Sequence, residues 1–342
     1  MPRDDLSPAH YTRAEHHRLE QEKVLWSSWV SVARCEDLAT PGDFVSFHHA
    51  GEPLVATRGK DGVLRAFSNV CRHRGTTLVE GCGRANSLQC PYHLWTYDLE
   101  GRLVGSPGME AVAGFERSAH RLPELAVDTW GGWVFVHLDR EAPPLLEALP
   151  QLEKTYPGAY LERLVRIGRT RCEQAVNWKI VVENFIESYH HAGTHPESLQ
   201  APYPYQQIRE VDNCGEAWSA IEHEPALAGL EPFAVPSIYP THLFAIVRPA
   251  AVTWFRLEIP SHDRVVIDVQ ILVVPELAGQ EGLAETQLAL VEAINAEDVA
   301  INRRTFEGLQ SRFAALGPLS PYEEGVRRFR RWLSDALART DD

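Results

Sequence analysis

The sequence has no run of about eighteen apolar residues, so no segment is long enough to cross a bilayer as a helix. The first residues, Met1 to Leu6, are charged and lack the apolar core of a secretory signal peptide. Positive charge is scarce as well, because 33 Lys and Arg face 47 Asp and Glu, for a net charge of −14. That balance disfavours nucleic acid or an anionic membrane as a partner. We therefore expect a cytosolic protein.

Cysteine is also sparse, since six cysteines in 342 residues do not suggest a disulfide framework. Hydrophobic residues make up 44% of the chain and charged residues 23%, which is ordinary for a globular protein. Neither an internal repeat nor a low-complexity segment is present. The chain is long for a single hydrophobic core, so we expect two domains.

Four side chains that can bind a metal are concentrated between positions 71 and 93. They occur as Cys71-x-His73 and Cys90-x-x-His93, with sixteen residues between the pairs. A [2Fe–2S] cluster with two Cys on one iron and two His on the other needs this composition. A zinc site is the alternative, but zinc motifs usually pair Cys with Cys and His with His. Cys82 belongs to neither pair, and we interpret it as a loop residue.

Short β segments bounded by Gly or Asp-Gly surround this motif and predict a small all-β domain over residues 42–150. Asp61-Gly62 is a strong hairpin signal. We expect the two halves of the motif to lie on two loops at one tip, and the Pro- and acid-rich residues 139–150 to form a linker. The expected strands are Phe44–Phe47, Pro53–Arg58, Val63–Phe67 and Gly132–Leu138.

The flanking regions differ in character. Residues 1–41 predict a helical segment, mainly over 8–24, that packs on the second domain, and we interpret His16 and His17 as surface residues. Residues 151–342 combine alternating apolar strands with long helical patterns, which predicts an α+β domain. Its expected strands are 165–172, 241–247, 252–259 and 265–274, and its expected late helices are 285–313 and 322–338.

A second group of possible metal ligands lies between Asn177 and His195. Asn177 is a plausible N-cap for a helix that would place Glu183, Glu187 and either His190 or His191 on one face. Gly193 would end this helix and let His195 turn back. Two imidazoles with a carboxylate from elsewhere match the 2-His-1-carboxylate triad of non-haem Fe(II) oxygenases.

Both motifs resemble those of Rieske non-haem iron oxygenases, in particular the catalytic α subunits of aromatic-ring-hydroxylating oxygenases. The residues around Cys71–His73 and Cys90–His93 match the Rieske motif, and the resemblance extends from about Trp26 to Leu333. Thr76 and Tyr92 stand where respiratory Rieske proteins carry a disulfide, which points to the ferredoxin and oxygenase branch. The family fold is a small all-β Rieske domain followed by a helix-grip (START-like) α+β domain with an antiparallel sheet.

The resemblance also implies roles for individual residues. Cys71, His73, Cys90 and His93 would bind the [2Fe–2S] cluster. The family pattern carboxylate-x₂-His-x₄-His fits Glu187, His190 and His195 without gaps. His190 and His195 would therefore bind mononuclear Fe(II), whereas His191 breaks the spacing, and Glu187 would be the carboxylate that links the iron to a neighbouring subunit's cluster. Asp298 would be the third iron ligand, with Glu297 as its rival.

As an activity, the resemblance implies a terminal oxygenase that uses O₂ and electrons from NAD(P)H, delivered by a reductase or ferredoxin. Such proteins assemble as homotrimers. Compact members mostly hydroxylate or demethylate a small organic substrate, so we favour monooxygenation. The alternatives are an aromatic cis-dihydroxylating dioxygenase and a Rieske electron carrier fused to a nonenzymatic binding domain.

Two further groups of residues carry weaker functional interpretations. Glu at position 187 is familiar among members that oxidise quaternary ammonium compounds. We interpret the arginines near the C-terminus as a solvated helix face, with docking of an acidic ferredoxin as the alternative, and the candidate pocket aromatics as core. These residues are Arg327, Arg328, Arg330 and Arg331, and Tyr203, Tyr205, Phe244 and Trp254.

Overall fold

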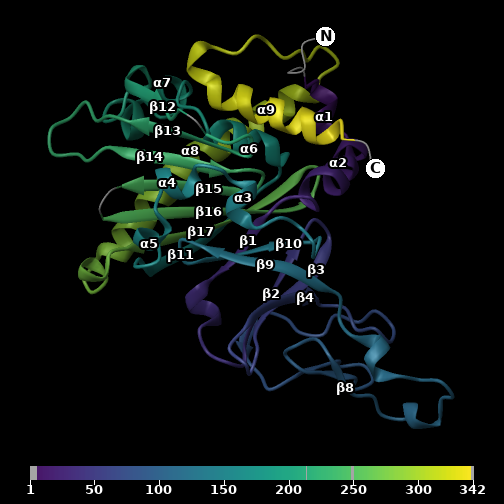
Figure 1. The fold of residues 1–342 in the computed structure, drawn as a ribbon. Coiled ribbons are helices and arrows are strands. Elements are labelled where there is room, and N and C mark those ends of the chain that lie inside the picture. Colours follow the sequence, from purple (N-terminus) through teal and green to yellow (C-terminus); the bar gives the residue numbers. More distant parts are fainter. Residues whose placement is uncertain (1–5, 213, 248–249, 340–342) are drawn as a thin grey trace. The chain divides into compact units, whose positions relative to one another are not determined.

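The computed structural model describes residues 6–212, 214–247 and 250–339, and Figure 1 draws their fold. The chain divides into two compact units. Unit 2 runs from Trp26 to Leu145, and unit 1 combines the segment up to Leu25 with the segment from Leu146 onward. The predicted start of unit 2, at 42, lies later than Trp26, because the apolar segment after Trp26 contributes a strand to this unit. The predicted end, at 150, lies five residues after Leu145.

Unit 2 is built on a seven-stranded sheet in the order β1-β10-β9-β4-β3-β2-β5, and each neighbouring pair is antiparallel. Asp61-Gly62 turns the chain between β3 and β4, with Gly62 at φ +76°. A smaller sheet has the order β6-β7-β8. The strands are β1 (Val30–Arg34), β2 (Asp43–His49), β3 (Glu52–Arg58), β4 (Leu64–Ser68), β5 (Cys82–Arg84), β6 (Leu88–Gln89), β7 (Thr96–Tyr97), β8 (Leu103–Gly105), β9 (Glu124–Trp130) and β10 (Trp133–His137).

Unit 1 contains a second seven-stranded sheet, in the order β11-β17-β16-β15-β14-β13-β12, again antiparallel throughout (Figure 1). Nine of the ten residues of β17 are buried, as expected for its apolar sequence. The strands are β11 (Val165–Gln174), β12 (Ile208–Glu210), β13 (Trp218–His223), β14 (Phe233–Ile238), β15 (His242–Val247), β16 (Ala251–Ser261) and β17 (Arg264–Val273).

Helices from both ends of the chain belong to unit 1. The longest, α8, packs on β11, where the Leu288 side chain lies over Gly168. No helix among the described residues is both long and apolar enough to span a bilayer. The α-helices are α1 (Pro8–Thr12), α2 (Ala14–Glu20), α3 (Leu145–Ala148), α4 (Leu152–Thr155), α5 (Gly158–Leu161), α6 (Trp178–Phe185), α7 (His191–Thr194), α8 (Leu283–Leu309) and α9 (Glu324–Leu337).

The helix that begins after Asn177 is shorter than predicted. The Asn177 side chain does cap it, by accepting a hydrogen bond from Lys179 N at 3.1 Å. It ends at Phe185, and a separate short helix, α7, contains Gly193 instead of ending at it. At the break, the Ile186 carbonyl packs so closely on Gly325 that a Cβ there would lie 2.3 Å from the oxygen. This contact with α9 is a tertiary feature that helical periodicity does not reveal.

The N-terminal helices are joined to α6 by buried charges. Lys179 Nζ lies 2.6 Å from Glu20 Oε1, and neither side chain is exposed. The Trp178 indole donates a hydrogen bond to the other oxygen of Glu20 at 2.9 Å. His17, interpreted above as a surface residue, is also buried, so that interpretation is wrong for His17. The described N-terminal residues, 6–25, therefore contribute to the core of unit 1.

The buried pair gives a stability prediction. Glu20→Ala should lower the free energy of unfolding by about 3–5 kcal/mol, because it leaves the Lys179 ammonium buried without a counter-charge. The double variant Glu20→Leu/Lys179→Met should recover most of this loss. Urea denaturation followed by tryptophan fluorescence measures both changes.

Glu22→Ala is the matched control, because Glu22 is exposed and its ion pair, as far as the described part of the chain shows, is with the exposed Arg18. It should change stability by less than about 1 kcal/mol. Equal effects of Glu20→Ala and Glu22→Ala would contradict the proposed role of the buried pair.

Candidate metal centres

The two halves of the Cys/His motif fold as two similar turns. Cys71 N donates to Thr76 O and Gly75 N donates to Cys71 O, at 2.9 and 3.0 Å. In the second half, Cys90 N donates to Trp95 O and Leu94 N donates to Cys90 O, at 2.8 and 3.1 Å. The fifth residue of each turn has a positive φ, +77° at Gly75 and +61° at Leu94. Each turn therefore presents one Cys and one His from a fixed loop.

The four side chains of this motif lie together, with the thiols buried and the imidazoles toward the surface. Cys71 and Cys90 are buried in an apolar cluster with the Trp95 and Tyr97 side chains. The His73 and His93 rings are 4.6 Å apart between centroids. His93 Nδ1 is buried and has no hydrogen-bond partner. Two adjacent thiols and two adjacent imidazoles, one with an unsatisfied nitrogen, fit a Rieske [2Fe–2S] cluster.

Tyr97 is a residue near this motif that the sequence analysis did not select. Its hydroxyl lies 3.6 Å from Cys71 Sγ and accepts a hydrogen bond from Arg72 N at 2.9 Å. Burial raises the pKa of Tyr97, so the hydroxyl stays protonated. Hydrogen bonds to cluster sulfurs are among the factors that set the reduction potential of an iron–sulfur cluster. In the sequence, Tyr97 stands out only by its position seven residues after Cys90, and this spacing does not reveal that its hydroxyl lies beside Cys71 Sγ.

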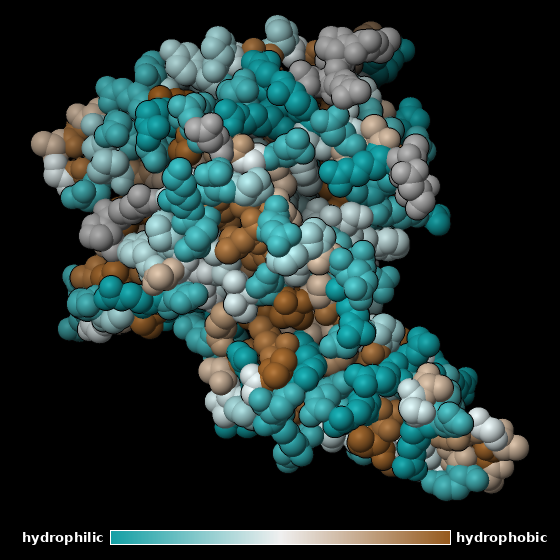
Figure 2. Space-filling model, viewed as in Figure 1, coloured by the Kyte–Doolittle hydropathy of each residue, from teal (hydrophilic) through white to brown (hydrophobic). Residues whose placement is uncertain are grey.

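The surface around the two imidazoles is partly apolar. Tyr92 and Leu94, on either side of His93 in the sequence, are 55% and 52% exposed. Figure 2 shows tan and brown residues among hydrophilic ones at the end of unit 2 that carries β8. An exposed apolar patch of this kind marks a possible protein contact surface.

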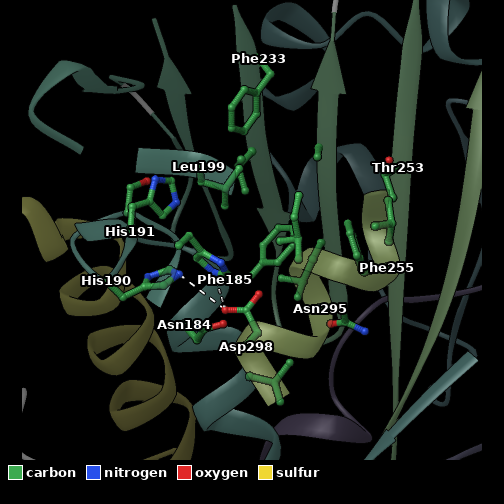
Figure 3. A pocket seen from close by; sticks show the side chains of 18 of the residues that line it. Asn184, Phe185, His190, His191, Leu199, Phe233, Thr253, Phe255, Asn295 and Asp298 are labelled. Atoms are coloured by element: carbon green, nitrogen blue, oxygen red, sulfur yellow. Dashed lines mark hydrogen bonds and ion pairs between the residues drawn. The ribbon is translucent and has the colours of Figure 1, made fainter. Parts of the chain in front are cut away.

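The second centre is formed by His190, His195 and Asp298, whose ligand atoms all lie within 4.8 Å of one another. Asp298 Oδ1 is 2.9 Å from His195 Nε2 and 3.7 Å from His190 Nε2. Figure 3 shows the Asp298 carboxylate, on α8, turned toward the His190 imidazole. Two imidazoles and one carboxylate on one side of a metal, next to a cavity, form the donor set of a non-haem Fe(II) site. These residues therefore fit a mononuclear iron.

The Nδ1 atom of each of these imidazoles, on the ring edge away from Asp298, contacts a glutamate carboxylate. His190 Nδ1 lies 2.5 Å from Glu187 Oε1, and His195 Nδ1 lies 2.6 Å from Glu297 Oε2. Burial alone would lower the pKa of His195, but its contacts with Asp298 and Glu297 raise it. Glu297, the rival for third ligand, is thus on the opposite edge of the His195 ring from Asp298. The geometry favours Asp298 as the metal-facing carboxylate.

His191, the rival of His190, faces away from this group. Its Nδ1 lies 3.3 Å from the Tyr203 carbonyl, and its ring stacks on that of His223. Burial lowers the pKa of His191 to about 2 and that of His223 to about 3, so both rings are neutral. His223 bonds Ser188 Oγ through Nε2 at 2.6 Å. The sequence analysis did not select His223 or Ser188, which lie 35 residues apart.

A cavity of about 250 Å³ adjoins His190, His195 and Asp298, and its far walls are mostly aliphatic and Phe side chains (Figure 3). Phe185, Phe233 and Phe255 line it, whereas Tyr203, Tyr205, Phe244 and Trp254 do not. Phe244 and Trp254 are buried within the sheet region instead, in agreement with their interpretation as core. Successive residues of a strand point to opposite faces, so their neighbours Leu243, Ala245, Thr253 and Phe255 face the cavity.

A second cavity, of about 260 Å³, shares Asn184, Glu187, His190 and Asn302 with the first. Its lining also carries Glu183, which receives two hydrogen bonds from Arg330, at 3.0 and 2.8 Å, and one from Tyr11 Oη at 2.6 Å. Arg330 is buried, so the interpretation of the late arginines as a solvated helix face is wrong for this residue. Glu183 therefore belongs to this network. Because α6 ends at Phe185, Glu187 lies beyond the helix, and the predicted helix face with both glutamates is not formed.

Comparison with protein families identifies both units. Residues 28–116 match the Rieske [2Fe-2S] domain, and residues 161–233 and 231–339 match the ring hydroxylating alpha subunit (catalytic domain). The two matches contain, respectively, all four residues of the Cys/His motif and all three residues of the second centre.

Individual relatives agree with these families. The chain is 36% identical over 189 residues to the carnitine monooxygenase oxygenase subunit of Acinetobacter pittii, a match that covers 54% of this chain and 51% of the relative. It is 32% identical over 213 residues to the glycine betaine monooxygenase oxygenase subunit of Pseudomonas aeruginosa, covering 59% and 49%. The matched region thus spans about half the length of these curated relatives.

The fold is also that of a solved quaternary ammonium Rieske monooxygenase, described in connection with carnitine oxidation and inter-subunit electron transfer. The TM-score is 0.87 at 25% sequence identity, over 98% of this chain and 96% of that one. The antiparallel sheets, the Rieske unit and the helix-covered catalytic unit expected from the sequence are therefore confirmed. The chain belongs to the ring-hydroxylating α-subunit family of Rieske non-haem iron oxygenases.

Proposed function

We propose that the chain is the terminal oxygenase of a Rieske system and monooxygenates a small organic substrate. The observation that carries the proposal is the convergence of His190, His195 and Asp298 beside a largely apolar cavity. For hydroxylation the balance is RH + O₂ + 2 e⁻ + 2 H⁺ → ROH + H₂O, with the electrons coming from NAD(P)H. Iron held by His190, His195 and Asp298 would supply the chemistry that activates O₂, and a cluster held by the Cys/His motif would supply single electrons.

In this proposal the protein holds each reactive group in a fixed orientation. His190 and His195 present Nε2 to the metal because Nδ1 of each ring is bonded to a glutamate. Asp298 supplies the third ligand from α8. The apolar walls of the cavity orient the substrate over this face and limit the access of water.

We further propose that Cys71, His73, Cys90 and His93 hold the cluster and that a reductase or ferredoxin delivers electrons to it. The exposure of Tyr92 and Leu94 beside the imidazoles supports a protein contact at this tip. A homotrimer, in which the cluster of one subunit serves the iron of the next through Glu187, is part of the proposal. The inter-subunit electron transfer described for the similar solved monooxygenase supports it. The cytosolic location stays a prediction.

For the substrate, we propose a quaternary ammonium compound, on the basis of the carnitine and glycine betaine relatives. The faces of Phe185, Phe233 and Phe255 in the cavity can contact ammonium methyl groups through cation–π attraction. The mostly apolar lining also fits an aromatic ring. Dihydroxylation of an aromatic substrate is therefore the second candidate function.

The proposal predicts the metal content of the chain. Anaerobically purified protein should contain about three irons and two acid-labile sulfides per chain, with a Rieske-type EPR signal after reduction. His195→Ala should lose about one iron and keep that signal, whereas Cys90→Ala should lose the signal. His191→Ala is the matched control and should keep all the iron.

Two results would contradict this assignment. Zinc without sulfide would exclude the cluster. About two irons in the wild type, unchanged by His195→Ala after Fe(II) loading, would favour the electron carrier fused to a binding domain.

The activity itself is tested by oxygen incorporation. With NAD(P)H, a reductase and ¹⁸O₂, L-carnitine or glycine betaine should give a product that contains one labelled oxygen atom, detected by mass spectrometry. Where the carbon bonded to nitrogen is hydroxylated, the C–N bond breaks into an amine and a labelled aldehyde, which is reduced at once to the alcohol so that exchange with water does not remove the label. Indole is the aromatic comparison. His195→Ala should reduce labelled product at least about 100-fold, since the iron ligand is lost. A diol from indole that contains two labelled oxygen atoms would contradict monooxygenation and favour dihydroxylation.

A further inference from the structure

We propose that Glu297 is a positioning residue for the mononuclear iron and not a ligand: its carboxylate fixes which nitrogen of His195 faces the metal. This inference rests on the proposed function, in which His190, His195 and Asp298 hold the iron. In the sequence analysis Glu297 was only the rival of Asp298 for the third iron ligand, and the inference gives it a role of its own.

The His195 ring is held between two consecutive residues of α8. Glu297 Oε2 lies 2.6 Å from Nδ1, and Asp298 Oδ1 lies 2.9 Å from Nε2. The His195 side chain is fully buried, so neither nitrogen can be satisfied by solvent instead. With Nδ1–H donated to Glu297, the lone pair of Nε2 is directed to the same side as the Asp298 carboxylate. The ring is thereby set in the tautomer that binds a metal.

The Glu297 carboxylate is itself held in place by the loop that follows His195. Ser198 Oγ donates to Glu297 Oε2 at 2.6 Å, and Ser198 lies in the π-helical turn Pro196–Gln200. Leu199 N and Gln200 N both donate to the His195 carbonyl, at 3.2 and 2.8 Å. One oxygen of Glu297 therefore accepts from the ligand ring and from its own supporting loop. These contacts join α8 to the segment that carries the ligand.

The two glutamates behind the imidazoles differ in their surroundings. Glu187 makes the same kind of contact with His190 Nδ1, but its side chain is 10% exposed, against 41% for Glu297. Glu187 also accepts a hydrogen bond from His190 N at 3.2 Å, within its own loop. Glu297 instead reaches across from another helix. We therefore assign Glu297 to the orientation of His195 and the attachment of its loop.

The test is the affinity of the metal-depleted protein for Fe(II), measured anaerobically by competition with a chromophoric chelator while the cluster is retained. Glu297→Gln should raise the dissociation constant about 10- to 100-fold, the usual effect of losing a carboxylate behind a metal-binding histidine. Glu297→Asp should restore part of the affinity. Ser198→Ala, which keeps the glutamate, should cause a smaller loss in the same direction.

A spectroscopic measurement separates ring orientation from a general loss of structure. The EPR signal of the Fe(II) site treated with nitric oxide should change shape in Glu297→Gln and return toward that of the wild type in Glu297→Asp. Glu307→Gln is the matched control, because Glu307 is on the same helix, is 76% exposed and, within the described residues, forms its ion pair with Arg303. It should leave both the affinity and the signal unchanged.

The outcomes distinguish this inference from the function on which it rests. Unchanged Fe(II) affinity and EPR signal in Glu297→Gln, with affinity lost in His195→Ala, would overturn the role of Glu297 alone. Unchanged affinity in both variants would overturn the iron site itself. If Glu297→Gln does not fold, Ser198→Ala decides, since wild-type affinity and signal in that variant would contradict the inference.

Discussion

The convergence of two short, distant segments is the constraint on which the catalytic unit depends. His195 and Asp298 are separated by 103 positions, yet their side chains must approach within hydrogen-bonding distance. The histidine segment is positioned by the break after α6, and the carboxylate by α8, which packs on β11. An error of about 1 Å in either element would spoil a metal site. The position of α8 and of the segment after α6 must therefore be fixed by contacts with the rest of unit 1.

Several contacts of residues other than His190, His195 and Asp298 stabilise this arrangement. Gly325 lets α9 pack directly on the Ile186 carbonyl, where α6 stops. One turn earlier, Glu183 is held by Tyr11 from the N-terminal helices and by Arg330 from α9. Two elements that are remote in the sequence, α1 and α9, therefore converge on the segment that leads into Glu187 and His190. Buried charge networks are costly when incomplete, so their members depend on one another.

The sequence predicted those features that depend on local spacing. The mixed Cys/His pairs led to the Rieske cluster, and the spacing of Glu187, His190 and His195 selected three residues that the structure groups around one site. Four of the seven strands in each large sheet were predicted within a few residues, because alternation and Gly-rich turns encode them directly. The other three in each sheet, β1, β5 and β9 in unit 2 and β12, β13 and β14 in unit 1, were missed. These patterns require no knowledge of what lies across the fold.

The features that depend on tertiary contact could not be predicted in this way. Asp298 and Glu297 are adjacent acids on one helix, and only the approach of the His195 ring distinguishes their roles. Arg330 lies among arginines that suggest a solvated surface, and its burial follows from the position of Glu183. The cavity lining was missed for a similar reason, since a shift of one residue along a strand moves a side chain to the other face.

The order of the units along the chain has a consequence for recombination. The cluster-bearing unit interrupts the catalytic unit, which begins before Trp26 and resumes at Leu146. A transplant that replaces everything upstream of Leu146 would also remove Tyr11 and Glu20, and would leave Lys179 buried with no counter-ion. A chimera with the cluster unit of another oxygenase must therefore replace residues 26–145 only, with one junction at each end, and keep the native residues 1–25.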